Sequence, residues 1–184
     1  DELETVERRV EKLIEDIKRE LRKVHEESKK LIREIKKELE DANRESERVI
    51  EEIKRELDRD KDSERVVERL EEKLRKLVRR SEEVIKELKK KLDELVKESE
   101  RVARELRRKL EELVREVERV VREVNSEDAR KMLEDVKKRA KDVEDEIEEV
   151  LRRDRELIKE LKRELDEALR ENRRLIEDLK RKIK

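Results

Sequence analysis

The sequence predicts an all-α protein: an antiparallel, up-down-up three-helix bundle of long, nearly straight helices, or untwisted coiled coil. Three observations lead to this fold class. The 184 residues include no glycine, no proline and no aromatic residue. The apolar residues recur with a period of 18 residues, and two short stretches interrupt the recurrence. Because an α-helix has 3.6 residues per turn, this period corresponds to whole turns of an undistorted helix.

The first predicted helix covers about residues 2–58. Its apolar seam advances by gaps of 3, 4, 3, 4 and 4 residues, three times over. A heptad repeat would average 3.5 residues per turn and would force a left-handed supercoil, so we expect a nearly straight helix here. The first set of gaps is carried by Leu3, Val6, Val10, Leu13, Ile17 and Leu21.

The second and third predicted helices cover about residues 63–124 and 127–184. Each apolar stripe spans an arc of roughly 120°, which suits a helix that contacts two neighbours. The 18-residue step continues in columns such as Leu70, Leu88 and Leu106 in the second helix, and Ile147, Leu165 and Ile183 in the third.

Two short connections separate the helices, at residues 58–63 and 124–128. Both are rich in Asp, Asn and Ser, which cap helices and form turns. Short loops make consecutive helices antiparallel neighbours. We therefore expect a single domain over residues 1–184, shaped as a rod roughly 90 Å long.

The centres of the three stripes turn polar at matching heights. In an antiparallel pair, residues at one level have a constant sum of residue numbers, and this sum is 127 both for Ser28 with Ser99 and for Ser46 with Ser81. The same reasoning places Asp154 with Ser99, and His25 lies at the edge of the same level. We expect a first polar layer of His25, Ser28, Ser99 and Asp154, a second polar layer of Asn43, Ser46, Ser81 and Asn172, and an apolar layer of Val10, Val117 and Val136.

Composition argues against most biochemical functions. The 57 basic and 58 acidic residues are interspersed and leave a net charge of −1, so we expect no nucleic acid partner and no membrane partner. Without glycine the chain cannot form the usual phosphate-binding loops, and with no cysteine and a single histidine it lacks the usual zinc ligands. We expect a soluble chain with no metal, no cofactor and no small-molecule ligand, and nothing in the sequence predicts its localisation.

The first polar layer also has the composition of a hydrolase triad. Ser28 or Ser99 would be the nucleophile, His25 the base and Asp154 the orienting acid. Such a triad needs an oxyanion hole and a substrate cleft, whereas amides within a helix are already bonded and the stripe offers only packed Leu, Ile and Val. We therefore predict that the chain is not an enzyme. We interpret both layers as buried hydrogen-bond networks that fix helix register and partner identity.

These features together resemble computationally designed parametric helical bundles. The resemblance rests on the 18-residue repeat, on the Leu, Ile and Val core, on the polar layers and on segments such as Glu45-Ser46-Glu47-Arg48-Val49-Ile50-Glu51-Glu52-Ile53-Lys54. It implies a scaffold with no natural ligand, substrate or cofactor. Spectrin-type repeats fit less well because they are shorter and carry tryptophan.

We therefore expect a designed, monomeric structural scaffold. The first alternative is an oligomerisation module that shares its core between chains as a homo-oligomer or hetero-oligomer. The least favoured alternative is a hydrolase built on Ser28, His25 and Asp154.

Overall fold

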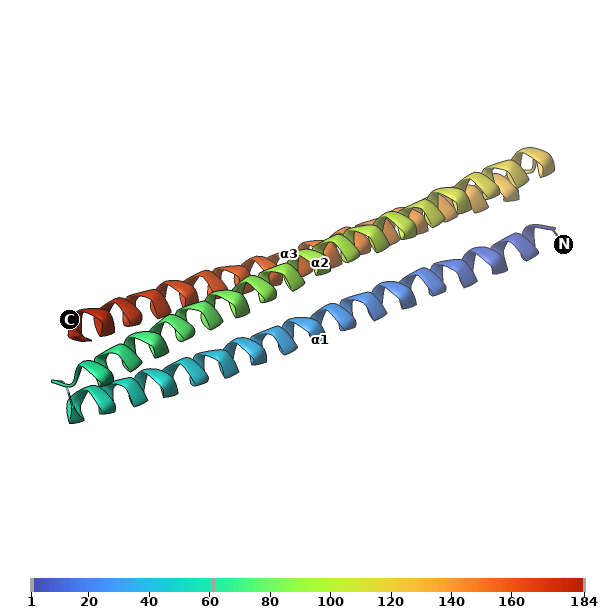
Figure 1. Ribbon diagram of the computed structural model, residues 1–184. Helices are drawn as coiled ribbons and strands as arrows, with labels where there is room; N and C mark the ends of the chain where they lie inside the picture. Colours follow the sequence, from blue (N-terminus) through green and yellow to red (C-terminus); the bar gives the residue numbers. More distant parts are fainter. Residues whose placement is uncertain (1, 61, 184) are drawn as a thin grey trace. The chain divides into compact units, whose positions relative to one another are not determined.

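A computed structural model of the chain describes residues 2–60 and 62–183. These residues form three helices and no strand: α1 (Glu2–Arg59), α2 (Glu64–Val124) and α3 (Glu127–Ile183). Figure 1 shows them as three coiled ribbons coloured along the chain. The predicted all-α, three-helix fold is confirmed. The expected last residue of the third helix, 184, lies outside the described residues.

The connection between α2 and α3 turns without glycine. Asn125 has a φ of 46°, in the left-handed region, and its amide donates a hydrogen bond to the carbonyl of Val121 at 2.9 Å. Asparagine tolerates this conformation better than most residues, so it can end α2 where glycine is the usual choice. Ser126 then caps α3, because its Oγ accepts a hydrogen bond from the amide of Ala129 at 3.1 Å.

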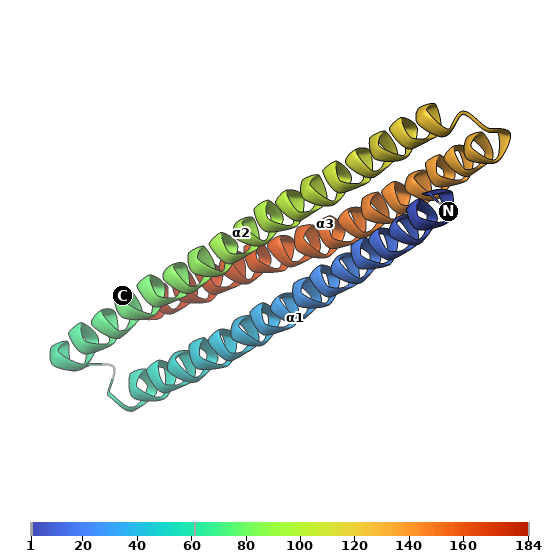
Figure 2. The same cartoon turned by 90° about the vertical axis from the view of Figure 1, so that its right-hand side faces the viewer.

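The chain divides into two compact units, called packing units below, and each helix contributes a segment to both. The first packing unit contains Asp1–Lys30 and Leu95–Glu156, and the second contains Leu31–Glu94 and Leu157–Lys184. In Figures 1 and 2 the first unit contains the blue part of α1, the yellow part of α2 and the orange part of α3. The second contains the cyan part of α1, the green part of α2 and the red part of α3.

Each packing unit has its own apolar core, made of the stripes that the periodicity predicts. In the first unit the core includes Ile17 from α1, Leu106 from α2 and Ile147 from α3, all nearly inaccessible to solvent. In the second unit the corresponding side chains include Ile53, Leu70 and Leu179. Burial of such side chains stabilises a fold by about 1.5–3 kcal/mol each, so these stripes supply the main driving force for folding.

Ion pairs between α1 and α2 show their relative direction in the first packing unit. Arg9 pairs with Glu116 at 2.8 Å, and Glu20 pairs with Lys109 at 3.3 Å. Residue numbers that rise along α1 fall along α2, so the two segments are antiparallel. The numbers in the two pairs sum to 125 and 129, on either side of the 127 that the polar positions predict.

Ion pairs between α2 and α3 show that these two segments are also antiparallel in the first packing unit. Glu118 pairs with Lys137 at 3.6 Å, and Arg107 pairs with Glu148 at 3.8 Å. These exposed pairs add little stability, but they report the helix register.

The second packing unit has the same helix directions. Its ion pairs again join rising residue numbers on one helix with falling numbers on the next. The pairs are Glu38 with Lys91 and Glu56 with Arg69 between α1 and α2, and Glu82 with Arg173 and Asp93 with Lys162 between α2 and α3. In each unit, therefore, the segments run up, down and up.

Two leucines on α3 give a matched test of the core of the second packing unit. Leu161 is fully buried, whereas Leu157, one turn earlier, is 37% exposed. We expect Leu161→Ala to lower the free energy of unfolding by about 2–5 kcal/mol, because it removes buried methyl groups and leaves a cavity. We expect Leu157→Ala to change it by less than about 0.5 kcal/mol. Urea unfolding followed by far-ultraviolet circular dichroism measures both, and equal effects of the two variants would contradict this assignment of the core.

Candidate functional site

The first polar layer lies within the first packing unit and draws on all three helices. His25 and Ser28 are three residues apart on α1, so they share one side of that helix. Ser99 comes from α2 and Asp154 from α3. Ser28 and Asp154 are almost completely inaccessible, at 1% and 2% exposure, and His25 is half-buried. The structure thus places all four predicted residues in the first packing unit.

A hydrogen bond between His25 and Asp154 joins α1 to α3 in this layer. His25 Nδ1 lies 2.9 Å from Asp154 Oδ1. When Asp154 is ionised its carboxylate can only accept, so Nδ1 carries the proton and donates. A charge-assisted bond of this kind is stronger than one between neutral groups, and it is directional.

Burial raises the pKa of Asp154 above that of an exposed aspartate. The main cause is desolvation, which disfavours the charged carboxylate. Hydrogen bonding from His25 and Ser28 and the positive charge of Lys29 act in the opposite direction, and the net effect remains a raised pKa. The layer therefore contains a buried acid for which ionisation has an energetic cost.

Two oxygen atoms of the first polar layer have no hydrogen-bond partner in the described protein. They are Ser99 Oγ and Asp154 Oδ2, and both are buried. A buried polar atom without a partner costs about 1–3 kcal/mol. The predicted network is thus only partly closed by protein groups.

The second polar layer lies within the second packing unit. Ser46 Oγ on α1 and Ser81 Oγ on α2 are buried and lie 3.4 Å apart. Asn43 and Asn172 are half-buried, and neither forms a hydrogen bond in the part of the chain that the structure describes. All four residues line one cavity of about 70 Å³. The structure thus gathers the predicted set around a cavity rather than in a closed network.

The first polar layer does not form the hydrogen-bond chain of a hydrolase triad. The link from His25 to Asp154 is present. Within residues 2–60 and 62–183, no hydrogen bond joins His25 to Ser28 or to Ser99. A nucleophile must lie within hydrogen-bond reach of its base, so the layer as observed pairs an acid with a base but bonds neither serine to that base.

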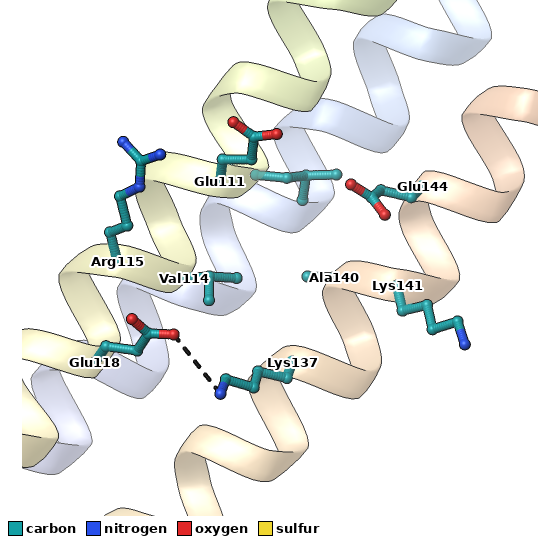
Figure 3. Close-up of a pocket in the computed structure, with 9 residues that line it drawn as sticks. Glu111, Val114, Arg115, Glu118, Lys137, Ala140, Lys141 and Glu144 are labelled. Atoms are coloured by element: carbon teal, nitrogen blue, oxygen red, sulfur yellow. Dashed lines mark ion pairs between the residues drawn. The ribbon is translucent and has the colours of Figure 1, made fainter.

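A surface groove between α2 and α3 was not predicted from the sequence. It has a volume of about 490 Å³ and lies in the first packing unit. In Figure 3, Val114 and Ala140 lie between the two helices, and an ion pair between Glu118 and Lys137 borders them. The groove follows from Ala140, a small residue in the stripe of α3. Its rim bears acidic and basic side chains in equal number, so no charge type dominates: Glu111, Glu118, Glu144, Arg115, Lys137 and Lys141.

Two other kinds of site are absent from the described residues. No three His, Cys, Asp or Glu side chains among them are grouped as metal ligands would be. None of the three helices contains a stretch apolar enough to cross a membrane, within the residues described.

Comparison with known proteins identifies the fold. The chain is similar to a solved structure described as a computationally designed three helix bundle, with a TM-score of 0.54 and 23% sequence identity. The likeness covers 99% of this chain and 86% of that one. No protein family model matches the sequence, and no curated protein matches it. At this identity the likeness shows the fold alone, and to that extent it confirms the resemblance to designed bundles.

The raised pKa of Asp154 predicts how Asp154→Asn changes stability with pH. Folding favours the neutral carboxyl, so its contribution to stability is fully present below about pH 4 and is lost as the pH rises through the folded pKa. Asparagine stays neutral and can still accept from His25. We therefore expect the variant to gain stability relative to the parent as pH rises from about 4 to 7, by about 1.4 kcal/mol per unit of pKa difference between folded and unfolded Asp154.

Urea unfolding of the parent and the variant across this pH range measures the difference. The same comparison in a His25→Asn background removes the imidazole that is bonded to Asp154. A difference that stays constant from pH 4 to pH 7 in both backgrounds would contradict the raised pKa.

Proposed function

We propose that this chain is a designed structural scaffold: a monomeric helical bundle without enzymatic activity, whose two buried polar layers fix the register of its helices. The observation that carries this proposal is the 2.9 Å hydrogen bond from His25 Nδ1 to Asp154 Oδ1. It joins two helices inside the core, and it connects residues whose positions in the sequence predict that they lie at one level.

A polar layer favours one register because its groups lose their partners when a helix slides. In the first packing unit, a slip of α3 by one turn would place the carboxylate of Asp154 beside Leu21, a buried core residue. An unpaired buried charge costs several kcal/mol. An apolar layer imposes no such penalty, since Leu, Ile and Val contact one another in many arrangements.

Replacement of the acidic and amide groups on α3 tests this proposal. In Asp154→Leu/Asn172→Leu we expect the free energy of unfolding to stay the same or to rise by about 1–4 kcal/mol, because apolar packing replaces polar groups that are only partly paired. We also expect α3 to adopt more than one register relative to its neighbours. The readout is the distance distribution between spin labels at Glu118→Cys on α2 and Lys137→Cys on α3, whose native charged groups are 3.6 Å apart. The chain has no other cysteine, so labelling is specific.

The control variant is Val136→Leu, which changes the apolar layer and leaves both polar layers intact. We expect a narrow distance distribution in the parent and in this control, and a broad or multiple distribution in the double variant. If the double variant kept the narrow distribution, a monomeric mass and the same unfolding cooperativity with no loss of stability, the polar layers would not specify the register.

One observation favours a second candidate, an oligomerisation module. Each packing unit consists of one helical hairpin and one further helix segment: the α2–α3 hairpin with α1 in the first, and the α1–α2 hairpin with α3 in the second. The further segment could come from another chain, as in a domain-swapped oligomer.

Mass in solution decides between the two candidates. For the scaffold we expect light scattering to give the monomer mass of 22.7 kDa at every protein concentration. A doubled or larger mass that falls on dilution would support the module. In that case the polar layers would help to select the partner chain.

A further inference from the structure

The cavity in the second polar layer has a mostly apolar wall, into which polar side chains from all three helices are set. Its volume is about 70 Å³, and polar side chains from all three helices line it: Asn43 and Ser46 from α1, Ser81 from α2 and Asn172 from α3. Apolar side chains such as Leu39, Leu77 and Ile85 complete the wall.

The polar groups around this cavity have unused hydrogen-bonding capacity. The 3.4 Å between Ser46 Oγ and Ser81 Oγ exceeds the 2.5–3.0 Å that is typical of bonds between hydroxyl groups, so this contact is weak. Each asparagine amide has two donors and one acceptor oxygen. Asn43 and Asn172 engage none of these with the described protein groups. A molecule in this cavity would find both donors and acceptors.

The size of the cavity limits the occupant. One water needs at least about 10–15 Å³ of such space and takes about 30 Å³ in the liquid, and a buried water makes two to four hydrogen bonds. At the volume of about 30 Å³ that a water molecule takes in the liquid, the cavity has room for about two water molecules. On its outer side, Glu45 and Arg80 line the cavity and pair at 3.7 Å across α1 and α2. The charged groups of both residues are exposed to solvent. They therefore favour entry of water into the cavity over entry of an apolar molecule.

We propose that this cavity is a hydration site, in which about two ordered water molecules connect Asn43, Ser46, Ser81 and Asn172. The water completes hydrogen bonding that the side chains cannot complete by direct contact. This inference deepens the proposed function by naming a ligand of the second polar layer. Its test counts water, whereas the test of the proposed function measures helix register, so either can fail alone.

Oxygen-17 magnetic relaxation dispersion on the full chain counts water molecules that stay bound for longer than nanoseconds. It reports water oxygen alone, so exchange of serine hydroxyl protons does not affect the count. We expect Asn172→Leu, which fills the cavity with apolar atoms, to lower the count by about two. The matched control is Asn125→Ala, which removes the asparagine of the α2–α3 connection and should leave the count unchanged. An equal count in the parent and in Asn172→Leu would overturn the proposal.

A second measurement needs no variant in the core. The chain contains three asparagines, Asn43, Asn125 and Asn172, and no glutamine, so its side-chain amide spectrum is simple to assign. We expect nuclear Overhauser effects from water to the Asn43 and Asn172 amides with the sign of a long-lived contact, and a short-lived contact at Asn125. Direct amide-to-amide contacts between Asn43 and Asn172, with no long-lived water at either, would contradict the hydration site.

Discussion

Burial of one apolar stripe per helix is the constraint on which the rest of the structure depends. Only 32% of the residues are apolar, and 62% are charged. Almost all the large apolar side chains must therefore lie on one side of each helix if a core is to form. The near-complete burial of Ile17, Leu106 and Ile147 in one packing unit, and of Ile53, Leu70 and Leu179 in the other, shows that this condition is met in both. The mixed charges on the outer faces follow from the same constraint.

The polar layers act against the energy of these stripes rather than adding to it. Desolvation raises the pKa of Asp154, and Ser99 Oγ and Asp154 Oδ2 have no protein partner. Such a layer is less favourable than packed leucine, so stability alone does not explain its presence. The proposed role in helix register would explain it, because the bond between His25 and Asp154 needs one helix arrangement, whereas leucine contacts form in many.

Geometry that depends on whole residues could be predicted from the sequence, as the ion pairs with residue-number sums of 125 and 129 show for α1 and α2. The stripe period and the index sum place Ser28, Ser99 and Asp154 near one level because one residue advances a helix by about 1.5 Å. The same method could not identify which atoms bond. That His25 reaches Asp154 rather than a serine, and that Ser99 Oγ has no protein partner, depends on side-chain torsions and on differences below 1 Å between helix axes. The cavity beside Asn43 and the groove beside Ala140 depend on the same small differences.

The two polar layers contain different residue types, and under the proposed register role the 18-residue repeat explains why they differ. Every 18 residues the stripe returns to the same side of the helix, so after a slip of 18 residues apolar stripes would still face one another wherever the helices overlap. Such a slip of α3 would move Asn172 to the level of His25 and would move Asp154 to the level of the valine layer. If the two polar layers were identical, the slipped helix would still find a matching polar layer at one of the two levels. Because one layer holds a base and an acid and the other holds amides and hydroxyls, the slipped helix would bring Asn172 instead of Asp154 to His25 and would break the bond between His25 and Asp154.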